Sequence, residues 1–362
     1  MFQAEAIINL RNLCKNYKFI KNTVYNSKIM AVVKADAYGH GLISIAKTLC
    51  NEGVYGFSVA LISEAKELIA HGISNPILHL GQFDVSEIDA YQTGQIRCTI
   101  NSIDDAKRLI EFSKESSSEI NAHLKIDTGM GRMGLPYEYA EKLIYYLSDH
   151  NEINIEGLYS HFSSADTDNE YTDIQLKRFI KIKKIAEKRL PEIKYFHISN
   201  SSAIINDNKA TFNMVRPGLS LYGISPIYES NPKIIPIMEL KAPVVLIKNM
   251  KKGHHIGYHR TYQLEKESSV ALIQAGYADG IPTSFANNGS VLYRGNKYPI
   301  IGKISMDLTC VLNHNKKLKT GNKVTFWSSD YRLEDIAKNN NKNPYEILTN
   351  ISKRVARVYK KA

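Results

Sequence analysis

Cysteine is scarce in this chain, and long hydrophobic runs are missing from it. The four cysteines are Cys14, Cys50, Cys98 and Cys310. No two of them stand in a CxxC spacing, which excludes a disulfide framework and a four-thiolate zinc site and is typical of free thiols in a reducing compartment. No stretch reaches the roughly 18 apolar residues that a membrane-spanning helix requires. Because Glu5 and Arg11 interrupt the first apolar residues, we expect no signal peptide and a cytoplasmic protein.

Acidic residues are outnumbered, since 36 Asp and Glu stand against 47 Lys and Arg and leave a formal net charge of +11. Such a surface attracts phosphates, carboxylates or nucleic acid, and the sign alone does not choose among them. The 43% of hydrophobic and 23% of charged residues are globular values that exclude a disordered chain and a long coiled coil. At 362 residues the chain exceeds the roughly 100 to 200 residues of one domain, so we expect two.

Short apolar runs alternate with segments of helical period through the first two thirds of the chain. The predicted strands are Ile29 to Ala35, Gly56 to Ala60, Ile77 to Leu80, Arg97 to Ile100, Ala122 to Asp127, Gly157 to Phe162, Tyr195 to Ser199 and Phe212 to Arg216. The predicted helices are Leu42 to Asn51, Ser63 to His71, Ser102 to Ser113, Glu138 to Asp149 and Gln175 to Arg189. Eight parallel strands with covering helices predict an α/β fold, a (β/α)8 barrel over residues 1–235, with a doubly wound open sheet as the alternative.

The pattern changes after Tyr222, where Pro226, Pro232 and Pro236 interrupt the chain. The later apolar runs are separated by turns, not helices, which predicts a second, mainly β domain over residues 236–362. Its predicted strands are Val244 to Ile247, Val270 to Ala275, Val291 to Tyr293 and Val324 to Trp327, and its predicted helices are Arg332 to Lys338 and Pro344 to Ile351.

Lys34 ends the first predicted strand, which places an amine at the active rim of such a barrel. A solvated lysine at a strand end is the plain alternative. The residues after it, KADAYGHG, add Gly39 and Gly41, which let backbone approach a ligand closely, and Tyr38, whose hydroxyl could reach a phosphate. A lysine in a partly dry pocket can form a Schiff base with an aldehyde cofactor.

Other strand ends carry residues of the same kind. HLKIDTGMGRMG surrounds Arg132 with glycines, and a guanidinium there suits a carboxylate. His161 ends the sixth strand, where a structural histidine is an equal alternative to a catalytic one. The stretches HISNSSA and MVRPGLSLYG end strands seven and eight, the usual phosphate site of this barrel, with Arg216 and Gly218. Together these groups suit an anionic, phosphorylated cofactor, and we predict no metal site.

AVVKADAYGHG, KIDTGMGRMG, SHFSSAD, NSSA, MVRPGLSLYG, GYADGIP and ISMD follow one another along the chain. In this order they resemble the alanine racemase family, whose members use pyridoxal 5'-phosphate, and the resemblance runs nearly end to end. It implies a barrel domain, a β domain, and a homodimer in which each active site uses the barrel of one chain and the β domain of the other.

The resemblance also implies roles for single residues. Lys34 would hold the cofactor and act as one base, and Tyr258 would be the base on the opposite face of the substrate. The implied cofactor contacts are Lys34, Tyr38, His161, Asn200, Ser201, Arg216, Gly218 and Leu219, with Lys353 in place of a tyrosine that is usual in the family. The implied substrate contacts are Arg132, Met306, Asp307 and Tyr277. Two bases on opposite faces allow racemisation without turning the substrate over.

Further positions depart from the family or carry open questions. Thr283 and Lys303 stand where entrance arginines are common, and Lys125 stands where some members carry a carbamylated lysine. The implied product is D-alanine for peptidoglycan. A serine racemase, a broad-specificity racemase and a non-catalytic cofactor-binding barrel remain alternatives. A nucleic-acid binder is not expected, because Lys and Arg are spread over the predicted helix faces, and no membrane partner is expected.

Overall fold

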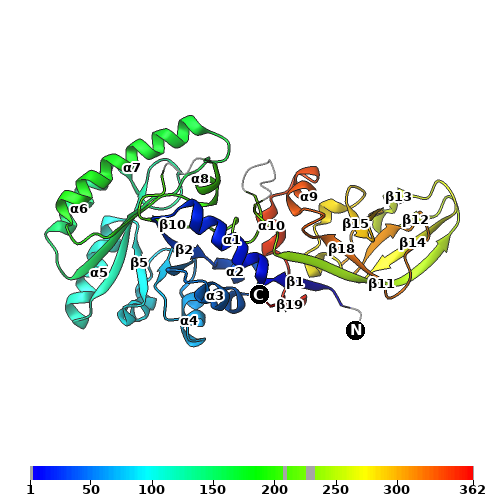
Figure 1. Ribbon diagram of the computed structural model, residues 1–362, viewed down its shortest axis with the longest axis horizontal. Coiled ribbons are helices and arrows are strands. Elements are labelled where there is room, and N and C mark those ends of the chain that lie inside the picture. The colour runs from blue at the N-terminus through cyan, green and yellow to red at the C-terminus, as the bar shows by residue number, and fades with distance from the viewer. Residues whose placement is uncertain (1–2, 207–209, 226–232, 362) are drawn as a thin grey trace.

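Eight parallel strands and the helices between them form the first lobe of the molecule (Figure 1). The computed structural model describes residues 3–206, 210–225 and 233–361. Pro226 and Pro232 lie outside these ranges. The strands are β2 (Lys28–Val32), β3 (Gly56–Val59), β4 (Ile77–His79), β5 (Ile96–Ile100), β6 (Ile120–Asp127), β8 (Ile153–Tyr159), β9 (Tyr195–His197) and β10 (Met214–Val215). All eight lie within or beside the predicted runs, so the predicted α/β barrel is confirmed.

The barrel closes at its last strand, β10, which lies between β9 and β2. The strand order is β10-β2-β3-β4-β5-β6-β8-β9, and the backbone N–H of Arg216 donates to the carbonyl of Ser199 at 3.0 Å. The short β7 (Leu135–Pro136) pairs beside β6. The interior of β3 and β4 is buried on both faces, which explains why these strands read as continuous apolar runs and not as alternating ones.

Helices cover the outside of the barrel. They are α1 (Leu10–Thr23), α3 (Leu42–Asn51), α4 (Ile62–Ala70), α5 (Ile103–Ser116), α6 (Ala140–Ser148), α7 (Asn169–Arg189) and α8 (Ser201–Asn206), with the turn α2 (Lys34–Gly39) and the 3₁₀ segments η1 (Val85–Thr93) and η2 (Tyr137–Tyr139). The sequence did not predict α1. Its buried face includes Asn16, which donates to the carbonyls of Leu221 and Ile235 at 3.0 and 2.8 Å, and this polar residue interrupts the apolar period.

The second lobe is built around an eight-stranded sheet, with a separate two-stranded one. The sheet contains β1 (Glu5–Asn9), β11 (Met238–Met250), β14 (Ser268–Ile273), β15 (Ser290–Tyr293), β16 (Asn296–Pro299), β17 (Thr309–Leu312), β18 (Lys323–Trp327) and β19 (Ala356–Lys360), and the separate pair is β12 (His255–Ile256) with β13 (Tyr262–Gln263). The shorter elements are α9 (Leu333–Asn339), α10 (Pro344–Thr349), η3 (Tyr258–Arg260), η4 (Tyr277–Asp279) and η5 (Thr283–Phe285).

The first strand corrects the range that we assigned to the barrel. β1 pairs antiparallel with β11 and parallel with β19, with Ile7 opposite both Glu239 and Val358. Its alternate residues Ala6 and Ile8 are buried, so the strand has the half-buried pattern of a sheet and no place in the barrel wall. The chain therefore starts in the second lobe, and Figure 1 shows this blue strand beside the C-terminal strand.

Candidate active site

A left-handed turn follows the first barrel strand and presents Lys34. Ala35, Asp36, Ala37 and Tyr38 all have φ between 52° and 55° and ψ between 41° and 55°. A left-handed helical conformation costs about 1 to 2 kcal/mol for each residue that has a Cβ. Such strain persists only where the surroundings impose it, and it concentrates at functional sites.

Side chains and distant backbone impose this conformation. The carboxylate of Glu64 accepts from the N–H of Ala35 at 2.6 Å, and Asp36 accepts from the N–H of Leu42 at 2.7 Å. At the far end of the turn, Gly39 lies so close to the second lobe that a Cβ would meet the carbonyl oxygen of Leu348 at 2.3 Å. The Arg357 guanidinium donates to the carbonyl of Gly39 at 3.1 Å, so both lobes hold the turn.

A cavity of about 890 Å³ opens beside this turn, at the carboxyl ends of the strands. This volume is within the roughly 300 to 1,000 Å³ of cofactor and ligand sites. The predicted site residues that line it are Lys34, Tyr38, Lys125, Arg132, His161, Asn200, Ser201, Arg216, Gly218 and Leu219. The structure therefore brings these predicted barrel residues together from the ends of five different strands, β2, β6, β8, β9 and β10.

Tyr38, Ser201 and Gly218 form one end of the cavity. The Ser201 hydroxyl oxygen accepts from the N–H groups of Gly218 and Ser220 at 3.0 and 3.2 Å. A Cβ at Gly218 would meet the Tyr38 hydroxyl at 2.8 Å, so only glycine leaves room for that hydroxyl. This cradle of hydroxyls and close backbone suits phosphate oxygens.

Arg216 is buried at 3% exposure and is fixed by its neighbours. Its guanidinium donates to His197 Nδ1, to the carbonyls of His197 and Ser160, and weakly to His161 Nδ1 at 3.5 Å. Since a guanidinium can only donate, His197 must accept at Nδ1 and carry its proton at Nε2, which lies 2.8 Å from His123 Nδ1. Burial first, and Arg216 next, hold the pKa of His161 and of His197 well below the usual range.

Arg132 lies on a loop that one carboxylate organises. Asp127 Oδ1 accepts from the N–H groups of Gly129 and Met130, and Oδ2 accepts from those of Gly131 and Arg132, at 2.7 to 3.2 Å. Asp127 was not among the predicted site residues, although its position two residues before Gly129 is typical of an Asx turn. The Arg132 side chain itself is exposed and free to meet a ligand.

Positive charge collects in the cavity. Burial lowers the pKa of Lys34, with Arg132 as a further cause, while Glu64 acts in the opposite direction. Burial also lowers the pKa of Lys125 to about 8, helped by Arg216, Arg132 and Lys34. A cluster of cations that lower one another's pKa favours the binding of a multiply charged anion. The residues present thus fit a phosphorylated aldehyde, with Lys34 as its amine and the Tyr38–Ser201–Gly218 end for its phosphate.

The predicted residues of the second domain do not line this cavity. Tyr258, Tyr277 and Met306 are 67%, 47% and 53% exposed, Lys353 is exposed, and Asp307 forms an ion pair with Arg354 at 2.7 Å. Thr283 and Lys303 are exposed as well. Figure 1 shows β12 and β13, which flank Tyr258, at the end of the molecule away from the barrel. One chain alone does not bring Tyr258 to its own Lys34.

Part of this second-domain set does come together. The N–H of Tyr277 donates to the carbonyl of Ser305 at 3.1 Å, and the N–H of Ala278 donates to the carbonyl of Met306 at 3.0 Å. Arg354 bridges Asp279 and Asp307 at 2.9 and 2.7 Å. These contacts place Tyr277, Met306 and Asp307 on one exposed surface.

Three residues of the cavity wall were missed by the sequence analysis. Tyr345, Asn343 and Asp166 line the cavity, and the Tyr345 ring lies 5.8 Å from that of Tyr38. Tyr345 and Asn343 belong to the segment predicted only as a loop and helix start. The sequence feature that could have indicated them is the aromatic residue at the start of a short helix. Without the fold, that feature is a weak indication of a ligand site. Tyr345 supplies an aromatic hydroxyl beside Tyr38 at this part of the cavity wall.

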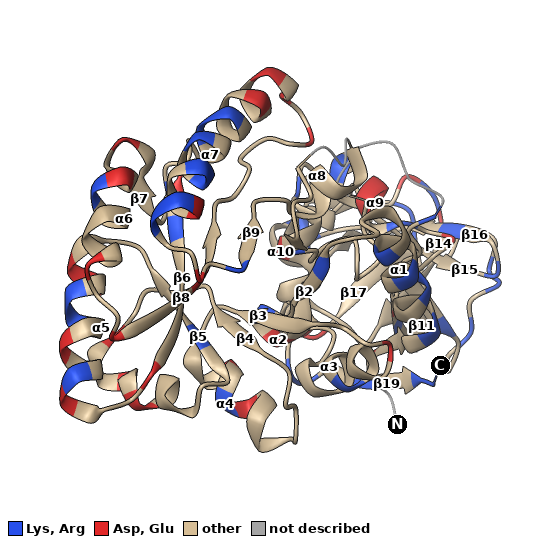
Figure 2. Cartoon of the chain, turned by 60° about the vertical axis from the view of Figure 1, so that its left-hand side comes forward, with Lys and Arg blue, Asp and Glu red and all other residues tan. Residues whose placement is uncertain are grey.

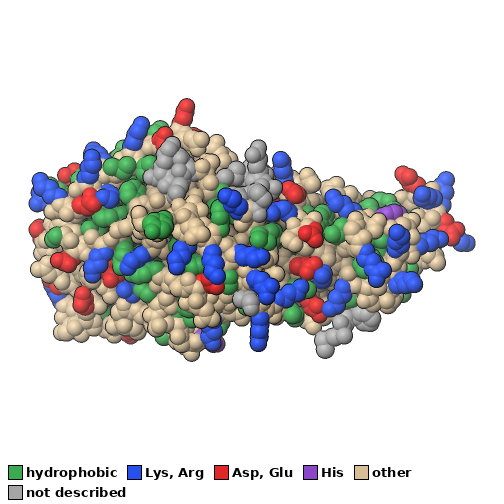
Figure 3. Space-filling view, in the orientation of Figure 1, with side chains coloured by type: hydrophobic (Ala, Val, Ile, Leu, Met, Phe, Trp, Pro, Cys, Tyr) green, Lys and Arg blue, Asp and Glu red, His purple; other side chains and the backbone are tan. Residues whose placement is uncertain are grey.

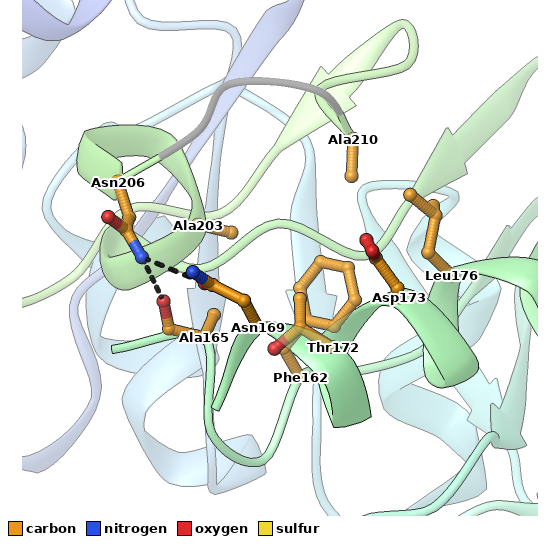
Figure 4. A pocket seen from close by; sticks show the side chains of 9 residues that line it. All are labelled: Phe162, Ala165, Asn169, Thr172, Asp173, Leu176, Ala203, Asn206 and Ala210. Carbon is orange, nitrogen blue, oxygen red and sulfur yellow. Dashed lines mark hydrogen bonds between the residues drawn. The ribbon is translucent and has the colours of Figure 1, made fainter. Parts of the chain in front are cut away.

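A smaller cavity lies behind Phe162, which also borders the main one. Its volume is about 100 Å³, and Figure 4 shows its lining, with Asn206 donating to the carbonyl of Ala165 at 2.9 Å. This space has room for a few waters and is too small for a cofactor. Within the described residues, no group of three or more His, Cys, Asp or Glu side chains could hold a metal ion.

Basic side chains are dispersed over the surface. Figure 2 shows Lys and Arg along α7 and α5, interspersed with acidic residues, and Figure 3 shows them over both lobes of the face in view. Dispersed charge of this kind is typical of a solvated surface and not of a nucleic-acid groove. No helix in the described part of the chain combines the length and the apolar character needed to cross a membrane.

Comparison with known proteins agrees with this geometry. The model of the alanine racemase N-terminal domain matches residues 8–226, and that of the alanine racemase C-terminal domain matches residues 237–359. The chain belongs to the alanine racemase family. The alanine racemase of Clostridium tetani is 39% identical over 365 residues, which cover 98% of this chain and 94% of that protein.

Solved structures of the alanine racemase family share the whole architecture. The alanine racemase of D-cycloserine-producing Streptomyces lavendulae superposes with a TM-score of 0.95 at 29% identity, over 100% of this chain and 98% of that one. The alanine racemase of Bartonella henselae, solved with covalently bound pyridoxal phosphate, superposes with a TM-score of 0.92 at 30% identity, over 99% of both chains. This chain is accordingly an isomerase of the alanine racemase family.

Proposed function

We propose that this protein is a pyridoxal-phosphate-dependent alanine racemase that acts as a homodimer with shared active sites and supplies D-alanine for peptidoglycan. The observation that carries the proposal is the cationic cavity that Lys34 lines, with a cradle of hydroxyls at one end, the buried Arg216 fixed by its neighbours, and the exposed Arg132 free to meet a ligand. Membership of the family and the cofactor bound to the Bartonella relative support the same reading.

The cofactor would be held by residues of the barrel. Lys34 would be the attachment point, Tyr38, Ser201, Gly218 and Leu219 would hold the phosphate, and Asn200 and His161 would stand beside the cofactor. When bound, pyridoxal phosphate draws electron density from the substrate α-carbon and so makes its proton acidic. Arg216 would face the cofactor ring with a group that only donates, because a guanidinium with a pKa of about 10 stays charged at neutral pH.

Two residues would move the proton. Lys34 serves one face of the α-carbon, and its lowered pKa increases the fraction of neutral amine that can accept a proton near neutral pH. The partner's Tyr258 serves the other face. Arg132 would hold the substrate carboxylate together with the partner's Met306, while the partner's Asp307 and the partner's Tyr277 would line the entrance.

The exposure of the second-domain residues supports the shared site. Tyr258 and Met306 are 67% and 53% exposed, and proton transfer by Tyr258 requires another surface that covers it. A second copy of the chain brings its own cationic cavity to such a surface, and two-fold pairing would complete both sites at once.

A Lys34→Ala variant tests the proposal. The holoprotein should convert L-alanine to D-alanine, and the variant should lose at least about 10³-fold in kcat because base and attachment point vanish together. Borohydride reduction of the wild type should leave the cofactor on Lys34. Lys28→Ala, an exposed lysine at the opposite end of the same strand, is the matched control and should keep full activity. Faster turnover of serine or of basic amino acids than of alanine would reassign the substrate.

A further inference from the structure

A small closed cavity lies where the barrel turn meets the second lobe. Its wall is formed by His40, Tyr222, Ile224, Pro236, Met238, Trp327, Ser328, Leu333 and Leu348, and the space open to the centre of a water molecule is about 10 Å³. That is room for one water and too little for a larger ligand. His40 and Trp327 are 0% and 1% exposed.

Two polar atoms on this wall have no hydrogen-bond partner among the described residues. They are His40 Nε2 and Trp327 Nε1. Buried polar atoms in folded proteins are nearly always paired with protein or with ordered water. Two such exceptions on the wall of one cavity therefore call for a common explanation.

The chemistry of the two atoms is complementary. His40 Nδ1 lies 2.9 Å from the carbonyl oxygen of Ala37, and because a carbonyl only accepts, Nδ1 carries the proton. Burial lowers the pKa of His40 to about 4, so the ring is neutral and Nε2 is an acceptor. Trp327 Nε1 is a donor only. One residue of the cavity wall thus offers a proton and another offers a lone pair.

We propose that this cavity binds one ordered water molecule, which accepts a hydrogen bond from Trp327 Nε1 and donates one to His40 Nε2. A third polar group stands on the wall. The Ser328 oxygen accepts from the N–H groups of Asp330 and Tyr331 at 3.2 Å each, which leaves the Ser328 hydroxyl proton to donate. Two or three partners are the number that a buried water requires.

The water would join the two lobes at the base of the active-site turn. Trp327 ends β18 of the second lobe, whereas His40 directly follows the left-handed turn of the barrel. The His40 ring stacks on Tyr222 at 4.7 Å, and Tyr222 lies against Tyr38 at 4.9 Å. These contacts involve neither the reaction nor the cofactor.

A high-resolution crystal structure of the wild-type holoprotein is the direct test. It should show one density peak within about 2.7 to 3.2 Å of both His40 Nε2 and Trp327 Nε1. Nitrogen NMR on the same protein should show His40 protonated at Nδ1 and not at Nε2. A dry cavity, a direct bond between indole and imidazole, or a proton on His40 Nε2 would each overturn the proposal.

Fluorescence gives a test in solution, because Trp327 is the single tryptophan of the chain. His40→Phe keeps a ring against Tyr222 but removes the acceptor, so the emission of Trp327 should shift to shorter wavelength as the indole loses its polar partner. Tyr222→Phe is the matched control, since the Tyr222 hydroxyl donates to the carbonyl of Val32 at 2.7 Å and not into the cavity, and its emission should equal that of the wild type. An unshifted emission in His40→Phe would contradict the bridging water.

Discussion

Lys125 shows how one residue takes its chemistry from its neighbours. It is 7% exposed, its ammonium lies 5.5 Å from the centre of the Tyr159 ring, and Arg216, Arg132 and Lys34 surround it with positive charge. A lysine with an ordinary pKa is almost fully protonated at neutral pH. With a pKa of about 8, roughly a tenth of Lys125 is neutral at pH 7 and about half at pH 8.

We expect Lys125 to be carbamylated by carbon dioxide. The neutral amine nitrogen bonds to the carbon of carbon dioxide and releases a proton, and the resulting anion is stabilised by Arg132 and Arg216. Labelled bicarbonate should give a carbamate carbon signal in NMR that grows severalfold from pH 6.5 to 8.5, as the neutral fraction increases through the pKa of about 8. Lys125→Ala should lack the signal. A spectrum of the wild type without it over this range would rule out the modification.

The left-handed turn is the element on which the site depends. Ala, Asp, Ala and Tyr all favour right-handed backbone, so the summed cost of the four residues is about 4 to 8 kcal/mol. Nothing local offsets a cost of that size. The hydrogen bonds that Glu64 accepts and Arg357 donates, and the close packing of Gly39 on Leu348, do so instead, which makes the conformation of the turn a property of both lobes.

Two glycines with the same backbone angle test this dependence. Gly39 and Gly53 both have φ of +79°, but a Cβ at Gly39 would meet Leu348 at 2.3 Å, whereas Gly53 has nothing within 4 Å. Gly53→Ala should cost about 1 kcal/mol of unfolding free energy from the backbone alone. Gly39→Ala should cost at least about 3 kcal/mol, because the turn must move as well. Urea unfolding of both variants measures the difference, and equal losses would mean that Leu348 does not hold the turn.

How well each element can be predicted depends on how far apart in the sequence its contacting residues lie. The barrel strands are buried on both faces, so their apolar runs were visible in sequence. The helix α1 was missed because Asn16 occupies its buried face, and β1 was misassigned because its partners in β11 and β19 lie more than 200 residues away. Strand ends revealed the barrel half of the site, but Glu64, Asp127 and Tyr345 act through contacts that only the folded chain creates.

Buried neutral histidines should make the stability of the whole molecule depend on pH. Burial lowers the pKa of His40 to about 4 and, together with Arg97 and Arg216, that of His123 to about 3. In the unfolded chain both have a pKa near 6.5. Below pH 6.5 the unfolded state therefore binds more protons than the folded one, and the unfolding free energy falls as the pH falls, by about 2 kcal/mol per histidine at pH 5.

Urea unfolding at pH 7.5, 6 and 5 measures this slope. His40→Phe should reduce the pH dependence of the unfolding free energy by the contribution of one histidine. His254→Asn, at an exposed position, should leave that pH dependence unchanged. A midpoint that stays constant between pH 7.5 and 5 would show that these histidines are charged in the folded protein.

In the proposed dimer, the arrangement of the two bases would be a property of the assembly and not of one chain. If Lys34 meets the partner's Tyr258, each site takes one base from each subunit. Mixing inactive Lys34→Ala and Tyr258→Phe dimers then creates heterodimers in which one site has both bases and the other has neither. Random exchange of equal amounts makes half of the dimers heterodimers, each with one intact site, so about a quarter of wild-type activity should return.

The same experiment separates a shared site from a site within one chain. If both bases came from the same subunit, every site of the heterodimer would lack one of them and mixing would restore nothing. Exchange is followed independently with differently tagged chains. As the matched control, a dimer of Tyr25→Phe, which changes an exposed tyrosine of the barrel lobe, is mixed with Lys34→Ala. This mixture measures the activity of sites that keep Lys34. If Lys34→Ala and Tyr258→Phe subunits exchange completely and no activity returns, the shared site is excluded. Tyr258, which is 67% exposed in each chain, would then have no cavity to serve.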